Sequence, residues 1–504
     1  MYLTWLSLVP PLVVIGAMLI THRLNVSLLI GIVSAALVAT EGQVVPAITL
    51  CAQKVIAHFS DMDMIFLYLL LVVISSLIVL LTVTGSAAGC ARIISRKMKT
   101  ARSGELSTIM LAFLLSIDDY LSILTVGLVM SPMADRLSIV RTKLAYIIHA
   151  LAGPLVIIVP ISTWAAAVLA QLDASGVNQS ATSRIFADPF YVYLQTVPFI
   201  FYSFFTVLAV CFVVLTRVGF GAIGHAERAM SASSDNDIYN DDENKHSLIE
   251  LLLPFGILVG CVFSALIVLG QSDSIFVILL IASLLAFASS VALLVYKKMI
   301  IVAQMPAILY AGFDLIKSSI VMVILASILG SFLRLDLHTG SYLASVLLGT
   351  APVFLLPVLF FAVSLMVTLM TGSAWGAFLM LIPISTQMLI SFLQFDTPVA
   401  LDQIPIVFPV LGAVLSGAAC GNHLSPFAET TVMTAACVDI DPLDHARTQF
   451  IYAVPVIIGT CTAFVVAGLT AQSGLAVCFS SSAGVGFVVM MVLFGLLNKL
   501  YKQE

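Results

Sequence analysis

Residues 111–132, LAFLLSIDDYLSILTVGLVMSP, show most clearly what type of protein this chain forms. The stretch is apolar and long enough to cross about 30 Å of hydrocarbon as a helix, yet Asp118 and Asp119 lie near its middle. A charge inside a membrane is expensive, so this pair needs a cation, a proton or a polar partner. We therefore predict an interrupted helix or a re-entrant hairpin, with its break at the aspartates.

Apolar stretches of similar length recur along the whole sequence. Hydrophobic residues make up 61% of the 504 residues and charged residues only 9%, which is more apolar than a soluble domain requires. We predict an all-α polytopic protein in a lipid bilayer, with about 11 spanning helices and two interrupted segments. Nothing in the composition supports binding to nucleic acid. The predicted spans are 5–22, 24–40, 63–85, 143–170, 190–216, 248–270, 275–296, 318–335, 404–435, 448–470 and 482–500.

The positions of Lys and Arg predict the orientation in the membrane. A second apolar stretch, 354–390, is interrupted by TGSAWG. If both interrupted stretches enter and leave on one face and the N-terminus lies outside, nearly all Lys and Arg residues become cytoplasmic. The exceptions are Lys54, Arg184 and Arg334. We predict a multi-pass protein of the bacterial inner membrane, with the N-terminus outside and the C-terminus in the cytoplasm.

The two halves of the chain follow the same order of segments. Each has a helix pair with a tight turn, then an amphipathic stretch that begins VPAITL at Val45 or MPAILY at Met305, then a helix, an interrupted segment and two more helices. Interrupted helices in inverted repeats place unwound backbone where it can coordinate ions or substrate. We predict a first transmembrane repeat at 1–216, a flexible cytoplasmic linker at 217–247, a second, inverted repeat at 248–470, and a final helix with a cytoplasmic tail at 471–504.

The aspartate pair has two interpretations. Asp is a favourable N-cap residue, so the pair can cap the apolar helix that follows it. Alternatively the pair binds an ion or a proton, because two carboxylates are more than a cap requires. Adjacent carboxylates do not ionise independently, so a proton and a cation would compete for them. We predict that Asp118 and Asp119 bind a cation and a proton.

A second candidate site lies in SGAACGNHLSPFAETT, residues 416–431, where Pro426 interrupts the helix. Broken backbone rich in oxygen atoms is suited to a hard cation such as sodium. The alternative is a kinked structural helix whose hydroxyl groups satisfy freed backbone groups. We predict that Glu429 joins the aspartates as a sodium ligand, and that Asn422 and His423 contribute to ion or proton binding.

Two further segments, PISTWAA at 160–166 and TGSAWGAF at 371–378, each combine small residues, hydroxyl groups and one Trp. They are candidates for facing unwound segments, and close helix packing is the alternative. His149 stands alone in an apolar segment, which is more typical of an interior histidine than of a proton relay. The predicted substrate-binding or gating residues are Ser122, Ser162, Thr163, Trp164, Thr371, Gly372, Ser373, Trp375, Ser425, Thr430 and Thr431.

At these residues the sequence resembles the NhaC-type sodium/proton antiporter family. The stretches that carry the resemblance are DDYLSILTVGLVMSPMAD (118–135), RTKLAYIIHALAGPLVIIVPISTWAA (141–166), TGSAWGAF (371–378), GNHLSPFAETT (421–431) and DHARTQFIYAVP (444–455). The resemblance implies that sodium and protons are the transported species, with no cofactor and no enzyme activity. It matches Asp118 and Asp119 to the family's paired aspartates, and Thr371, Gly372 and Trp375 to its second interrupted segment.

The chain departs from this family's pattern at the second site. Asn422 and Glu429 stand where family members typically carry Asp, and Ala428 replaces a usual serine. One carboxylate is therefore missing and another is longer. This leaves room for a changed ion preference, or for sodium-coupled carriage of a small organic acid or amino acid.

We predict a secondary active transporter, either a sodium/proton antiporter that works by alternating access or a carrier of an organic solute driven by the same ion site. A channel is the alternative among transport proteins, but acidic residues in broken helices of two inverted halves favour an alternating site. An intramembrane hydrolase would need a nucleophile with its base or a histidine-rich metal motif, and the sequence offers no such pattern. The sequence leaves a homodimer open.

Overall fold

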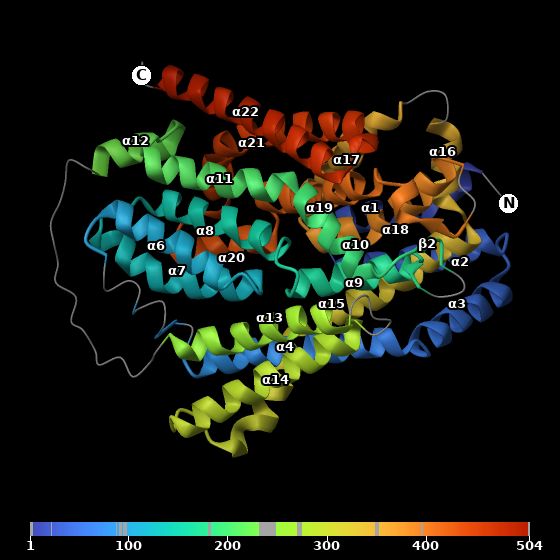
Figure 1. Ribbon diagram of the computed structural model, residues 1–504, viewed down its shortest axis with the longest axis horizontal. Helices are drawn as coiled ribbons and strands as arrows, with labels where there is room; N and C mark the ends of the chain where they lie inside the picture. The colour runs from blue at the N-terminus through green and yellow to red at the C-terminus, as the bar shows by residue number, and fades with distance from the viewer. Residues whose placement is uncertain are drawn as a thin grey trace.

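The computed structural model describes residues 4–21, 23–86, 88–89, 93, 98–179, 183–230, 248–269, 275–347, 352–394 and 397–501. These residues are almost entirely helical (Figure 1). Within these ranges, nine helical stretches are long and apolar enough to span a membrane, and shorter apolar helices accompany them. The predicted all-α polytopic membrane fold is confirmed.

The first half of the chain runs from α1 to α12. Its helices are α1 (Val9–Thr21), α2 (Leu24–Ala39), α3 (Val44–Phe59), α4 (Met62–Val83), α6 (Ala101–Leu114), α7 (Asp119–Arg136), α8 (Arg141–Val156), α9 (Thr163–Ala174), α10 (Pro189–Thr196), α11 (Phe201–Thr216) and α12 (Gly221–Met230).

The second half runs from α13 to the C-terminus. Its helices are α13 (Ile249–Leu269), α14 (Ile275–Tyr296), α15 (Met305–Ser331), α16 (Thr339–Leu347), α17 (Leu356–Thr371), α18 (Ala374–Phe392), α19 (Val407–Leu424), α20 (Glu429–Val438), α21 (Pro442–Thr470) and α22 (Leu475–Tyr501). A π-helical turn, η4 (Phe332–Asp336), extends α15. Three two-residue strands, β1 (Val177–Asn178), β2 (Ile185–Phe186) and β3 (Val399–Ala400), form a parallel sheet that joins the loops of the two halves.

Both predicted interruptions are present. The first apolar stretch divides into α6 and α7, and α7 begins directly after Asp118. The second divides into α17 and α18 at Gly372, which has a φ of +71° in the left-handed region. Glycine is favoured there because it has no Cβ atom. In Figure 1 the hairpin of α6 and α7 lies in the left part of the molecule and the hairpin of α17 and α18 in the right part.

Two spans that we counted as one crossing each are divided in two, one at the interruption predicted from Pro426 and the other at the segment 160–166 predicted to be unwound. The span predicted at 143–170 consists of α8 and α9, and the span predicted at 404–435 consists of α19 and α20. Pro160 lies in the first break and Pro426 in the second, where each removes a backbone donor and disfavours helical conformation in the residue before it. Each half therefore combines a hairpin with a broken helix.

Three other predicted boundaries are corrected. The span expected at 318–335 begins at Met305, because the amphipathic stretch and the helix are continuous in α15. The span expected at 190–216 is divided between α10 and α11 by a 3-10 turn, Val197–Phe199. The predicted linker begins with helix α12, and its residues 231–247 lie outside the described residues.

In each half, the tip of the hairpin lies against the break in the following helix. The backbone N–H of Thr163, at the α8–α9 break, donates to the carbonyl of Ile117 at the α6–α7 tip, 3.3 Å away. In the second half, the Ser425 hydroxyl at the α19–α20 break donates to the carbonyl of Leu369 near the α17–α18 tip, at 3.0 Å. In both halves a group at the break therefore donates a hydrogen bond to a backbone carbonyl at or near the tip.

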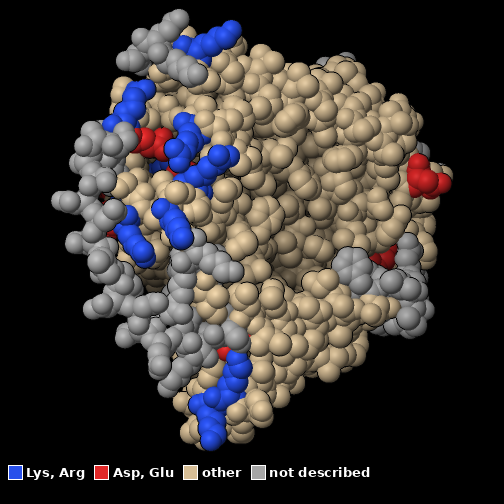
Figure 2. Space-filling model, turned by 60° about the vertical axis from the view of Figure 1, so that its left-hand side comes forward, with Lys and Arg blue, Asp and Glu red and all other residues tan. Residues whose placement is uncertain are grey.

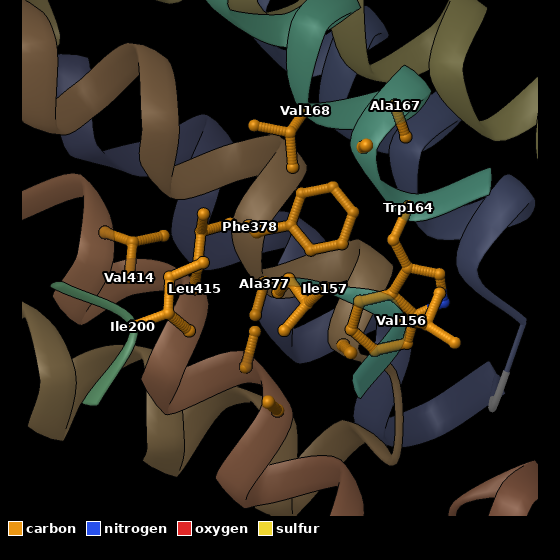
Figure 3. Close-up of a cluster of buried hydrophobic side chains, with 14 of the residues drawn as sticks. Val156, Ile157, Trp164, Ala167, Val168, Ile200, Ala377, Phe378, Val414 and Leu415 are labelled. Carbon is orange, nitrogen blue, oxygen red and sulfur yellow. The ribbon is translucent and has the colours of Figure 1, made fainter. Parts of the chain in front are cut away.

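A buried apolar cluster joins the halves behind these breaks (Figure 3). Trp164, Ala167 and Val168 of α9 face Ala377 and Phe378 of α18 in this cluster, and all five are at most 1% exposed. The ring centroids of Trp164 and Phe378 lie 6.0 Å apart. Close packing of this kind holds α9, which follows the first break, against α18 of the second hairpin.

Basic side chains gather at one end of the molecule. Figure 2 shows them on the face that lies at the left of Figure 1, where α6, α7, α8 and α12 end or begin. We call this the basic face. Lys54, which we predicted on the opposite side, pairs with Asp336 at the end of α15, with 2.7 Å between Nζ and Oδ2. Helix α3, which carries Lys54, lies at the right end of Figure 1, away from the basic face.

Candidate functional site

A cavity of about 760 Å³ lies where both hairpin tips and both helix breaks meet. Many of the residues that we predicted from the sequence line it. They are Asp118, Asp119, Thr163, Trp164, Thr371, Gly372, Ser373, Trp375, Asn422, Glu429 and Thr430.

Asp118 has two roles in this geometry. Its side chain caps α7, since Oδ1 accepts from the backbone N–H of Leu121 at 3.0 Å. Its other oxygen, Oδ2, accepts from the hydroxyl of Thr163 across the helix break at 3.1 Å. Capping therefore accounts for one of the two aspartates. The bond to Thr163 ties the hairpin to the broken helix.

Asp119 is the carboxylate that capping does not explain. It is the first residue of α7, it is 3% exposed, and it lines the cavity beside Asp118. Among the described residues, neither aspartate forms an ion pair with Lys or Arg. Two buried carboxylates without a basic partner favour binding of a cation or a proton.

Glu429 brings a third carboxylate to the cavity from the second half. It is the first residue of α20, and its Oε2 accepts a hydrogen bond from the hydroxyl of Tyr120, the residue after the aspartates. This contact links the first turns of α7 and α20. The first-half and second-half carboxylates therefore face one shared space.

Four helices begin at this cavity. They are α7, α9, α18 and α20, and their first residues or capping residues belong to its wall or lie next to it. The N-terminus of a helix carries a partial positive charge, which stabilises nearby anions. These helix ends offset part of the cost of burying Asp118 and Asp119, and they also attract the more exposed Glu429.

The α17–α18 tip is built to approach the second break closely. A Cβ atom added at Gly372 would lie 2.9 Å from the carbonyl oxygen of Phe427, closer than real Cβ contacts allow. Ser373 caps α18 by accepting from the backbone N–H of Gly376 at 3.1 Å. Trp375 follows and meets Trp164 of the first half edge to face, with centroids 6.4 Å apart.

Among the described residues, the cavity wall does not include four other predicted site residues, Ser122, Ser162, Ser425 and Thr431. Ser162 caps α9 and donates to the carbonyl of Val156 at 2.7 Å. Thr431 donates to the carbonyl of Ser425 at 2.7 Å. Ser122 is buried on α7. The hydroxyl groups of Ser162, Thr431 and Ser425 satisfy backbone groups freed by the breaks, which is the structural alternative stated above.

His423 is buried behind the second break. Its Nδ1 lies 2.7 Å from the hydroxyl of Tyr202 on α11, and its ring is 2% exposed. Its neighbours include His149 of α8, whose ring meets it edge to face at 5.1 Å. The structure thus places His423 with other buried polar side chains, one layer away from the cavity.

Sequence reasoning missed several residues of the site. Arg23 and Asn25, at the turn between α1 and α2, line the cavity with Ser318 of α15, and Asn25 donates to the Ser318 hydroxyl at 3.4 Å. His445 and Gln449 of α21 contact His149. The polar residues 318 and 319 inside an apolar span were a sequence feature that could have indicated the first group. No local sequence pattern indicated that His445 contacts His149.

Comparison with known proteins shows which family and which solved structure this chain resembles. Residues 181–469, more than half of the chain, match the model of the Na+/H+ antiporter family. An uncharacterized protein of Haemophilus influenzae is 27% identical over 93% of this chain and 92% of its own length. The crystal structure of the Alcanivorax borkumensis YdaH transporter, which has an unusual topology, aligns with a TM-score of 0.58 at 15% identity, over 84% of this chain and 88% of its own. The chain is a multi-pass membrane transporter and belongs to the Na+/H+ antiporter family.

Proposed function

We propose that this transporter is a secondary active sodium/proton antiporter. The observation that carries the proposal is the buried pair Asp118 and Asp119, which lines the cavity between the two halves without a basic partner among the described residues. Membership in the Na+/H+ antiporter family supports it.

Sodium and protons compete for the carboxylates in this mechanism. Two adjacent buried carboxylates do not both ionise easily, so one holds a proton when no cation is present. A sodium ion supplies the missing positive charge and displaces that proton. The oxygen atoms of Thr163 and Glu429, which face the same cavity, suit a hard cation.

Alternating access follows from the two hairpin and break units. The units meet around the cavity through contacts such as Tyr120 with Glu429 and Trp164 with Trp375. A rigid-body shift of one unit against the other exposes the carboxylates to each side in turn. The basic face is then cytoplasmic by the positive-inside rule, in a bacterial inner membrane.

A sodium-coupled carrier of a small organic acid or amino acid is the second candidate. A volume of 760 Å³ is far larger than a sodium ion needs, since one water molecule occupies about 30 Å³ in the liquid. Arg23, Asn422 and four helix N-termini could bind a carboxylate in this space, and Trp375 and Phe427 could contact its apolar part.

Proteoliposomes that contain a pH-sensitive dye distinguish the candidates. Under the antiporter proposal, an inward sodium gradient alone drives proton efflux, and Asp119→Asn abolishes it. Asp135→Asn is the matched control, because Asp135 is half exposed and pairs with Arg141 on the basic face. Proton movement that appears only when an organic or amino acid is added would favour the second candidate.

A further inference from the structure

Three buried histidines lie next to the cavity, and the mechanism above does not use them. His149 of α8, His423 of α19 and His445 of α21 are each at most 2% exposed. The ring centroid of His149 lies 5.1 Å from the centroid of each of the other two. Within the described residues, no carboxylate or basic side chain forms an ion pair with any of them.

One hydroxyl group connects His149 to the cavity. Thr430 lines the cavity and donates to Oδ1 of Asn422, which also lines it, at 2.5 Å. The same Thr430 oxygen lies 3.1 Å from Nε2 of His149. A hydroxyl both donates and accepts, and it can rotate between partners. Thr430 is therefore a bridge between the cavity and the imidazole.

The second nitrogen of His149 also faces acceptors. Its Nδ1 lies 3.2 Å from Oε1 of Gln449 and 3.0 Å from Nε2 of His445. The orientation of the Gln449 amide is set by its Nε2, which donates to the carbonyl of His423 at 2.5 Å. Nε2 of His149 can therefore accept from the Thr430 hydroxyl while Nδ1 donates to Gln449 or His445, so the ring can take a proton at one nitrogen and release one from the other.

His445 lies near the basic face. It is in the first turn of α21, where its backbone N–H bonds the carbonyl of Asp441, and Asp441 and Asp444 are exposed on the same turn. Arg141, at the start of α8, bonds Asp439 in the adjoining turn. Nδ1 of His445 has no hydrogen-bond partner among the described atoms.

We propose that Thr430, His149 and His445 form a proton relay between the cavity and the basic face, a path for protons separate from the opening of the cavity. The relay rests on the proposed exchange of sodium for protons. The titratable groups that face it are His423 and the phenols of Tyr146, Tyr202 and Tyr452.

Each transfer in the relay conserves protons. A proton from the cavity binds Oγ1 of Thr430 while the proton of that hydroxyl moves to Nε2 of His149. The proton on Nδ1 of His149 moves to Nε2 of His445, and solvent water at the basic face accepts the proton on Nδ1 of His445. Rotation of the hydroxyl and the reverse tautomeric shift of the rings restore the starting state.

Two transport assays on the full-length protein in proteoliposomes test the relay. Exchange of labelled sodium for sodium needs the ion site but no net proton transfer, whereas sodium-driven proton movement needs both. We expect His149→Gln and His445→Gln to lower sodium-driven proton movement about 100-fold, as loss of a positioned proton-transfer group does, and to leave sodium/sodium exchange within about twofold. His225→Gln, an exposed histidine of α12, is the matched control and should change neither.

The other outcomes contradict the proposal. Wild-type proton movement in both variants would show that protons pass through the cavity alone. Equal loss of both activities would show that the histidines only support the structure of the site. If the wild-type protein shows sodium/sodium exchange but no sodium-driven proton movement, the antiporter proposal itself fails, before the variants are compared.

Discussion

Asp118 and Asp119 are neighbours in sequence, yet the structure gives them different tasks. Asp118 holds the first turn of α7 and the Thr163 hydroxyl, so both of its oxygen atoms already have partners. Asp119 lines the same cavity and takes no part in that cap. A helix cap needs one short acceptor side chain, and asparagine serves as well as aspartate. Charge and capping can therefore be separated by substitution at position 118.

We predict different results for two substitutions of Asp118. Asp118→Asn keeps an acceptor for the Leu121 N–H, so the thermal unfolding temperature in detergent should stay near that of the wild type while sodium-driven proton movement is lost. Asp118→Ala removes the cap as well and should cost about 1 kcal/mol of stability. Normal transport by Asp118→Asn would remove this carboxylate from the proposed ion site.

At the scale of elements, each hairpin tip and helix break form a unit held by close backbone contact. Local sequence predicts part of this. Pro160 and Pro426 lie in breaks, but Pro132, Pro154, Pro383 and Pro455 lie inside helices. A proline alone is therefore insufficient to locate a break. The neighbouring tip is the second factor, because backbone carbonyls at or near the tip accept hydrogen bonds from groups at the break.

Gly372 tests the contact between tip and break. We predict that Gly372→Ala destabilises the protein by about 1–3 kcal/mol, because its φ is positive and the new Cβ would press on the Phe427 carbonyl. Thermal unfolding in detergent measures this. Gly484→Ala is the matched control, since a Cβ there meets nothing within 4 Å. Equal stability of the two variants would contradict the close contact at the tip.

A buried ion pair fixes the first hairpin to the broken helix at the basic face. Nζ of Lys143 on α8 lies 2.8 Å from Glu105 on α6, and both side chains are at most 5% exposed. A second carboxylate, Glu227 of α12, lies 2.5 Å from the same nitrogen. The three side chains together join α6, α8 and α12.

We predict that Lys143→Met destabilises the protein by about 3–5 kcal/mol, because it leaves the buried Glu105 without its cation. The double variant Lys143→Met with Glu105→Gln should recover much of this loss, because it removes the unpaired charge. Unfolding by heat in detergent compares the two. A double variant less stable than the single one would show that the charge on Glu105 is not the cause.

For the whole molecule, the sequence was sufficient for the membrane class, the two interruptions and eleven of the 25 described residues that line the cavity. Hydropathy and the polar residues inside apolar spans are local features, and they follow directly from the cost of polar groups in lipid. Contacts between the halves are different. His149 and His445 are 296 positions apart, and His423 and Asn422 are adjacent, yet only Asn422 reaches the cavity. Which of these residues contact one another or line the cavity depends on how the helices pack in the complete fold.

Proton release on addition of sodium to the purified protein, in a weakly buffered detergent solution, measures the competition for Asp118 and Asp119. We predict that sodium binding releases protons, and that the apparent sodium affinity falls as the pH is lowered, by up to about tenfold per unit while the site is mainly protonated. Asp119→Asn should release none. Sodium binding without proton release, or release that Asp119→Asn leaves unchanged, would contradict a shared carboxylate site.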